Sequence, residues 1–236
     1  MPGGLKNLFE AVCCAAFCAV AGASALEVVV VQVDGDELSG TLEKADAEGL
    51  SVGGKAVKLA DVAEVRVQGA AKPASPARPR IVLRNGDVIY AYIMEGGEQG
   101  LKLNSEPLGE LSIKCNSLRG IIFPTPNSAA EAAVEAFMSQ KEANEDQMFS
   151  PKGETTAGFM NKFTDKELVL DVGGQKRTVP YEQMAAFRFA AVEKYTPQAG
   201  VLAALRLSDG TVLSGQLAGL AGGKLSLKNA DGALWP

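Results

Sequence analysis

Apolar and polar residues alternate in short stretches along most of this chain, and turn-forming residues separate the stretches. Alternation with a period of two places successive side chains on opposite faces of a strand, so the pattern predicts short antiparallel strands. Four stretches share one order of strands and turns, and they begin at Glu27, Arg80, Gln147 and Val201. The chain is therefore predicted to contain four copies of one structural repeat.

Each copy has a glycine in the turn after its first strand and a small residue five positions later. The turn pairs are Asp34-Gly35, Asn85-Gly86, Lys152-Gly153 and Asp209-Gly210, and the small residues are Gly40, Ala91, Gly158 and Gly215. Asn-Gly and Asp-Gly pairs favour two-residue hairpin loops, because both central residues tolerate positive φ. A small residue allows the second strand to bend sharply, as a closed barrel requires. Each complete copy is thus predicted to be five short strands wrapped into a small barrel.

The stretches between the copies have other patterns. Residues 70–79 are rich in Ala and Pro, which is typical of a flexible linker. Residues 127–145 are rich in Ala and Glu and predict a linker helix reaching about Asn144. The predicted organisation is a signal peptide over 1–25, barrel repeats over 26–69, 80–126 and 146–191, and an incomplete repeat over 199–236.

The first residues resemble an export signal. An apolar run from Val12 to Val20 follows Lys6, and Ala23 and Ala25 have the spacing of a cleavage site after Ala25. The run is too short to span a bilayer as a helix. The alternative is an N-terminal helix that is buried in the protein or retained in the membrane. We predict an exported protein, periplasmic or extracellular, with no stable membrane insertion after cleavage.

Composition excludes several kinds of chemistry. The sequence has no histidine, which excludes Ser-His-Asp and Cys-His catalysis and histidine zinc sites. Cleavage after Ala25 would leave Cys115 alone, so it is interpreted as a filler residue without a disulfide. Glu95, Glu98 and Glu106 would form a glycosidase pair only if two of them met in one cleft. The net charge of −5 argues against nucleic acid as a partner. We predict no enzymatic activity, no cofactor and no metal site.

The strand order, the turn glycine and the small residue in the bent strand resemble Sm-like and SH3-type small barrels. The second copy is closest, since its residues 117–123 (SLRGIIF) look like the arginine-glycine turn before the last strand of Sm proteins. The resemblance implies a mainly β fold of tandem five-stranded SH3/Sm-like small barrels with one inserted linker helix. Sm proteins contact RNA through an Asp and an Asn four residues later. Asp46 keeps the first position, but Leu50 replaces the second, so the resemblance does not carry RNA binding to this chain.

The whole arrangement resembles the N-terminal region of long exported proteins from planctomycete-type bacteria, in which similar repeats precede a C-terminal carbohydrate-binding module. That resemblance implies carbohydrate as a partner, although the sequence contains no part of the module. The fourth copy stops at Trp235-Pro236, before a final strand. We therefore expect the sequence to be a fragment of a longer protein.

Three residues are candidates for binding. If Ile89, Ala91 and Ile93 face the core, Tyr90 and Tyr92 point outward and could stack on a sugar or on a partner. The alternative for both tyrosines is contact with the helix or the neighbouring barrel. Arg119 either forms a salt bridge at the last turn or contacts an anion.

These features predict a non-catalytic structural or interaction protein. Its repeats would space or present a protein partner or a missing C-terminal domain of the same chain. The alternative is a glycan-binding or cell-wall-binding module.

Overall fold

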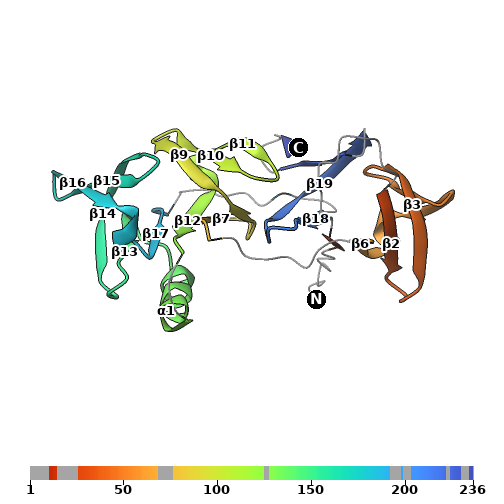
Figure 1. Cartoon of the computed structure of the whole chain (residues 1–236), viewed down its shortest axis with the longest axis horizontal. Helices are drawn as coiled ribbons and strands as arrows, with labels where there is room; N and C mark the ends of the chain where they lie inside the picture. The colour runs from red at the N-terminus through yellow and green to blue at the C-terminus, as the bar shows by residue number, and fades with distance from the viewer. Residues whose placement is uncertain are drawn as a thin grey trace, which may run out of the picture. The chain divides into compact units, whose positions relative to one another are not determined.

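A computed structural model shows that the chain is mainly β, with antiparallel sheets, as the alternating pattern predicts (Figure 1). The described residues are 11–14, 26–68, 77–124, 128–191, 198, 203–221, 224–229 and 234–235. The chain forms two compact units, one of residues 1–74 with 196–236 and one of residues 75–195. We call them the outer unit and the inner unit, after their order in the sequence. The outer unit combines the first and fourth repeats, and the inner unit combines the second and third.

The first repeat is an open sheet in the outer unit. Its strands are β2 (Leu26–Gln32), β3 (Glu37–Ala45), β4 (Gly49–Val52), β5 (Lys55–Lys58) and β6 (Val62–Val67). β2 pairs with β3 and with β6, and the sheet continues from β3 through β4 to β5. A 3-10 turn, η1 (Leu59–Asp61), connects β5 to β6.

The fourth repeat completes the outer unit. Its strands are β18 (Ala203–Arg206), β19 (Val212–Ala221), β20 (Lys224–Lys228) and β21 (Leu234–Trp235), each paired with the next. A short strand from the start of the chain, β1 (Ala11–Cys14), lies between β6 and β18 and runs parallel to both. β1 falls in the predicted signal segment, whose cleavage stays a prediction.

The inner unit joins two repeats through their last strands. The second repeat has β7 (Arg80–Leu83), β8 (Val88–Tyr90), β9 (Tyr92–Gly97), β10 (Gly100–Ser105), β11 (Gly109–Ile113), η2 (Cys115–Ser117) and β12 (Leu118–Ile122). The third has β13 (Asp146–Phe149), β14 (Thr155–Phe163), β15 (Glu167–Val172), β16 (Gln175–Pro180), η3 (Tyr181–Gln183) and β17 (Ala186–Arg188). β12 pairs with β7 and with β17, and β17 pairs with β13. The resulting strand order is β7–β12–β17–β13.

In the described parts of the chain, no repeat closes into the predicted barrel. β5 and β6 are consecutive but do not pair, because η1 takes the backbone out of the ladder between them. η2 and η3 stand at the same place before β12 and β17. The prediction of mainly β structure is confirmed, whereas closed five-stranded barrels are not found.

The four predicted turns share one geometry, which differs from the predicted one. Each turn glycine has a φ between 86° and 94°. In the first turn the N–H of Gly35 donates a hydrogen bond to Gln32 O, and the N–H of Gln32 donates one to Asp36 O. These two bonds define a three-residue loop between Gln32 and Asp36. A loop of this kind needs positive φ only at the glycine. This explains why Lys152 can precede Gly153 in the third repeat.

Each second strand contains a β-bulge near the small residue at which a bend was predicted. Three positions after the small residue, one residue is skipped in the pairing with the third strand. The skipped residues are Glu43, Met94, Asn161 and Ala218. The small residue is needed because strands approach closely there: a Cβ at Gly158 would lie 2.3 Å from Asp171 O. A bulge bends a strand and increases its twist, so the four repeats curve in the same way.

One α-helix is found among the described residues, α1 (Ser128–Ser139), and it belongs to the core of the inner unit. Val134, Phe137 and Met138 pack against Ile122 and Ala186. The helix ends five residues before the predicted Asn144, and strand arginines bind the carbonyl groups at its end. Within the described residues, no helix has the length and apolar character needed to cross a membrane.

Candidate functional site

The two candidate tyrosines lie on either side of the buried Ala91, at the bend between β8 and β9. Tyr92 has 57% of its surface exposed, as the alternation predicts, whereas Tyr90 is partly buried. The guanidinium carbon of Arg78 lies 5.6 Å from the centre of the Tyr92 ring, within cation–π range. Binding by either tyrosine stays a prediction.

Arg119 serves the packing of the helix. Its guanidinium donates a hydrogen bond to Met138 O, 2.9 Å away, near the end of α1. Its own backbone O accepts a hydrogen bond from the N–H of Phe189. Arg119 therefore holds the end of a helix, which is a contact different from both the salt bridge and the anion contact that we expected.

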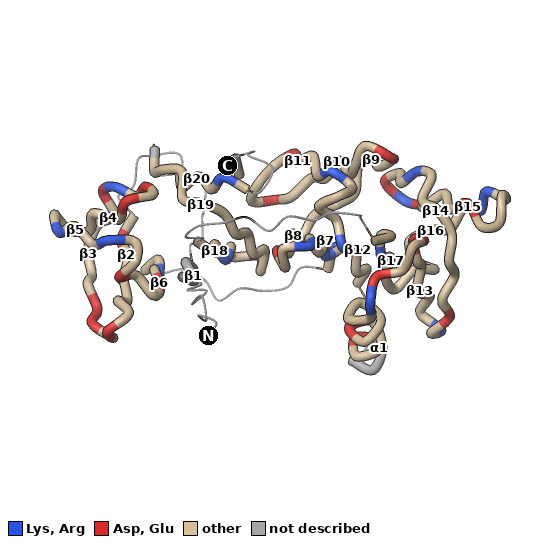
Figure 2. The backbone as a smooth tube through the Cα atoms, turned by 180° about the vertical axis from the view of Figure 1, so that it is seen from behind, with Lys and Arg blue, Asp and Glu red and all other residues tan. Residues whose placement is uncertain are grey.

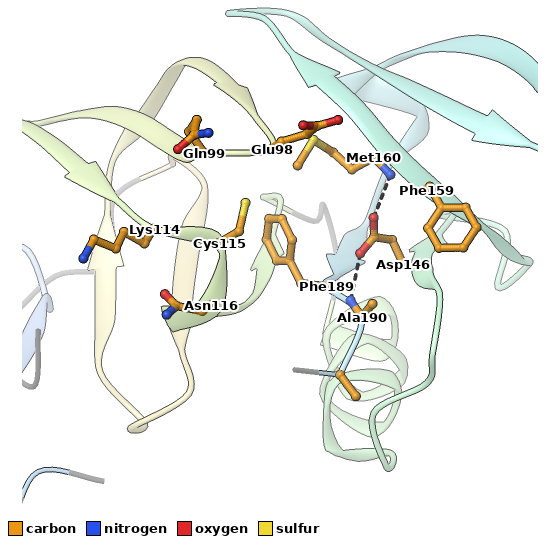
Figure 3. Close-up of a pocket in the computed structure, with 11 residues that line it drawn as sticks. Glu98, Gln99, Lys114, Cys115, Asn116, Asp146, Phe159, Met160, Phe189 and Ala190 are labelled. Carbon is orange, nitrogen blue, oxygen red and sulfur yellow. Dashed lines mark hydrogen bonds between the residues drawn. The ribbon is translucent and has the colours of Figure 1, made fainter. Parts of the chain in front are cut away.

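A groove in the inner unit, between the second and third repeats, is the best candidate site (Figure 3). Its volume is about 570 Å³, which lies in the range of small-molecule sites. It is lined by Glu98, Gln99, Lys114, Cys115, Asn116, Asp146, Phe159, Met160, Phe189, Ala190 and Ala191. The second repeat contributes the β9–β10 turn and η2, and the third contributes β13, β14 and the residues after β17.

A buried carboxylate, Asp146, builds one wall of the groove. One of its oxygens accepts the N–H of Met160 at 2.6 Å, and the other accepts the N–H of Ala190 at 2.7 Å (Figure 3). These bonds tie β13 to β14 and to the chain after β17. Both oxygens are engaged by backbone groups, so Asp146 stabilises this wall of the groove.

Cys115 is a structural thiol on the opposite wall. Its Sγ donates a hydrogen bond to Gly97 O, 3.3 Å away. Burial, and secondarily the charge of Asp146, raises the pKa of the Cys115 thiol. A raised pKa keeps the thiol protonated at neutral pH and makes it a weak nucleophile. This geometry agrees with the interpretation of Cys115 as a filler residue.

The open edge of the groove combines an aromatic ring with polar groups. Phe159 has 56% of its surface exposed. Glu98, Gln99, Lys114 and Asn116 lie on the opposite side (Figure 3). A groove lined by an exposed ring together with carboxylate and amide groups can bind an amphipathic ligand, since the ring takes an apolar face and the polar groups take hydroxyls.

Phe159 was not among the residues singled out from the sequence, although a signal for it exists. It directly follows Gly158, as Tyr92 directly follows Ala91. The corresponding residues in the outer unit are Thr41 and Gln216. The position after the small residue is therefore aromatic in both repeats of the inner unit and polar in both repeats of the outer unit.

The other predicted glutamates are held in surface ion pairs. Glu95 pairs with Lys102, and Glu106 pairs with Arg78. The hydrogen bond and the charge of Lys102 lower the pKa of Glu95, the opposite of the shift that a glycosidase acid needs. Acidic and basic residues are interspersed along the strands and turns of the chain (Figure 2).

Among the described residues, no group of three or more metal-ligating side chains comes together. Comparison of the sequence with models of known protein families finds no match, and a search of curated protein sequences finds none either. The candidate site is accordingly interpreted from its own geometry.

Proposed function

We propose that this chain is an exported, non-catalytic interaction protein whose inner unit presents the groove between its two repeats to a partner. The observation that carries the proposal is the exposed aromatic ring of Phe159 in the lining of the groove. Tyr92, at the equivalent position of the second repeat, is exposed as well but lies outside the lining of the groove. Aromatic residues contribute a large contact area with few rotatable bonds and are enriched in interfaces.

We also propose that the repeats are open relatives of SH3/Sm-like small barrels. Three repeats share a bent second strand with a bulge and a 3-10 turn before the last strand. Pairing of β12 with β17 joins two such repeats edge to edge. Repeats joined in this way give a partner a fixed surface, which suits spacing or presentation rather than chemistry.

The use of polar side chains supports a non-catalytic role. Asp146, Cys115 and Arg119, three polar side chains of the inner unit, each bind backbone groups. Catalytic groups need freedom to exchange protons or to attack a substrate. Here these groups hold strands and a helix in place.

A photo-cross-linking experiment tests this function. Benzoylphenylalanine is introduced at Phe159 or Tyr92 in the full chain, and Val33, an exposed residue of the outer unit, is the control position. We expect a discrete cross-linked protein from exported material at Phe159 and Tyr92 but not at Val33. Identical products at all three positions, or none at Phe159 and Tyr92, would contradict an aromatic contact surface.

Glycan binding is the second candidate, and the composition of the groove edge favours it. The ring of Phe159 can stack on a sugar ring. The amides of Gln99 and Asn116 and the carboxylate of Glu98 can bind sugar hydroxyls. A groove of about 570 Å³ has the volume to hold a few sugar rings.

Phe159→Ala tests the glycan candidate. Loss of the stacking surface is expected to weaken binding to a polysaccharide or peptidoglycan panel about ten-fold, the equivalent of about 1.4 kcal/mol. Met94→Ala is the matched control, because Met94 is also a large exposed apolar side chain of the inner unit but does not line the groove. Absence of glycan binding by the unmodified protein would remove this candidate and leave the protein partner.

A further inference from the structure

The two units share an arrangement around one central strand. In the inner unit β17 lies between β12 and β13 and is antiparallel to both. In the outer unit β1 lies between β6 and β18 and is parallel to both. β6 and β12 are the last strands of the first and second repeats. β18 and β13 are the first strands of the fourth and third repeats. β1 therefore occupies the place that β17 has in the inner unit, but with the opposite direction.

β1 is a weakly held occupant of this place. It has four residues, and three of them pair on each side. Val12 is opposite Glu64 on β6 and Ala204 on β18, and Cys13 is opposite Val65 and Leu205. Parallel pairing is slightly less stable per residue than antiparallel pairing. A longer antiparallel segment would form a better ladder with the same two strands.

The space between β6 and β18 borders mainly apolar residues. A small cavity of about 30 Å³ in the outer unit is lined by Val62, Glu64 and Val65 of β6 and by Ala203 of β18. In the inner unit the central strand inserts Phe187, which is fully buried. Its ring contacts Phe163 and Phe189, with ring centres 5.3 and 5.1 Å apart. The flanking strands of the outer unit thus suit a strand that, like β17, places an apolar side chain on one of its faces.

We propose that the space between β6 and β18 is a strand-accepting site for an extended apolar polypeptide segment donated by a partner protein. The segment runs antiparallel to both strands, as β17 does, and displaces β1. Two facing rows of backbone N–H and C=O groups give affinity, and the apolar lining selects the side chains. Removal of the predicted signal segment would open the same site. The proposal rests on the interaction function proposed above but concerns the outer unit alone.

Peptide binding to the full chain tests the proposal. Val12→Pro removes a backbone donor in the middle of β1 and weakens its ladder. The matched control is Ala21→Pro, which lies outside β1. The probe is a fluorescent peptide with the sequence of residues 184–190 (MAAFRFA), and a peptide with proline in place of the phenylalanine that corresponds to Phe187 is its control. Fluorescence anisotropy is expected to show that the peptide binds about ten-fold more tightly to Val12→Pro than to the unmodified chain or to Ala21→Pro, because β1 no longer competes for the space between β6 and β18.

Equal affinity of the three proteins, or equal binding of the proline peptide, would overturn the proposal. Hydrogen exchange of the unmodified chain gives a test that does not depend on the variant folding. Excess peptide should raise exchange in residues 11–14 while β6 and β18 stay protected. Unchanged exchange in residues 11–14 at saturating peptide would also overturn it. Neither result bears on Phe159, whose experiments concern the inner unit.

Discussion

Replacement of Arg188 by Met is expected to destabilise the inner unit by about 3 kcal/mol or more and to release α1 from the sheet. Arg188 lies on β17 with only 2% of its surface exposed. Its guanidinium donates to Phe137 O at 3.0 Å and to Gln140 O at 2.9 Å, and it also binds the side chain of Gln147. Met keeps the apolar stem but leaves the two carbonyl groups at the helix end without these donors.

The surroundings of Arg188 explain the size of the effect. The guanidinium carbon is 4.9 Å from the centre of the Phe137 ring, so cation–π attraction is lost as well. Burial, and then the charge of Arg119, lowers the pKa of Arg188, which shows that the charge is placed at a cost. The carbonyl groups at the helix end offset that cost by accepting hydrogen bonds from the guanidinium. Arg188→Met removes the charge together with these hydrogen bonds, so the variant measures their net contribution to stability.

Denaturant unfolding followed by circular dichroism measures the change, and hydrogen exchange of residues 128–139 reports the release of the helix. Arg177→Met is the matched control, because Arg177 is an exposed arginine of β16 in the same repeat. The control should change stability by less than about 0.5 kcal/mol. Equal stability of the two variants would contradict the role given to Arg188.

Phe187→Ala is expected to cost about 3 to 5 kcal/mol, the range for deletion of a buried aromatic ring. Phe187 lies in the middle of β17, the strand that joins the two repeats of the inner unit. Its ring meets Phe163 and Phe189 edge to face, with interplanar angles of 90° and 82°. The cavity would therefore open among the aromatic rings of the third repeat, on the strand whose backbone pairs with the second repeat.

Phe159→Ala provides the control for Phe187, since it removes the same atoms from an exposed position of the same unit. Thermal unfolding with hydrogen exchange read separately in the two units should show the loss in residues 75–195 alone. A loss of less than about 1 kcal/mol for Phe187→Ala would contradict a shared core at β17.

The turns and bends could be predicted because each depends on a residue type. A turn glycine, which can adopt positive φ, and a small residue where two strands approach closely are both recognised by residue type in a sequence. The bulge was missed, because the skipped residues Glu43, Met94, Asn161 and Ala218 have no chemical property in common. Closure into barrels was predicted wrongly because the apolar pattern does not show that η1 removes the backbone from the ladder.

The packing of α1 shows a different limit. Alternation along β17 correctly places Phe187 and Phe189 on the face opposite to Arg188. It does not show that a helix covers the Arg188 face as well. Only Phe137 and Met138 of the helix, which need an apolar partner, indicate that coverage. The groove was missed for the related reason that its two walls come from repeats about 50 residues apart in sequence, and period-two patterns carry no information on which edges meet.

The pairing of the first repeat with the fourth has a consequence for biosynthesis. Synthesis and transport deliver a chain from its N-terminus, so the first repeat emerges long before Thr196, where the rest of its unit begins. Residues 75–195 form a continuous unit and can fold as soon as they have emerged. The edge of β1 that faces β18 stays open until Ala203, Ala204 and Leu205 arrive. It is in this interval that a holding chaperone would find its substrate.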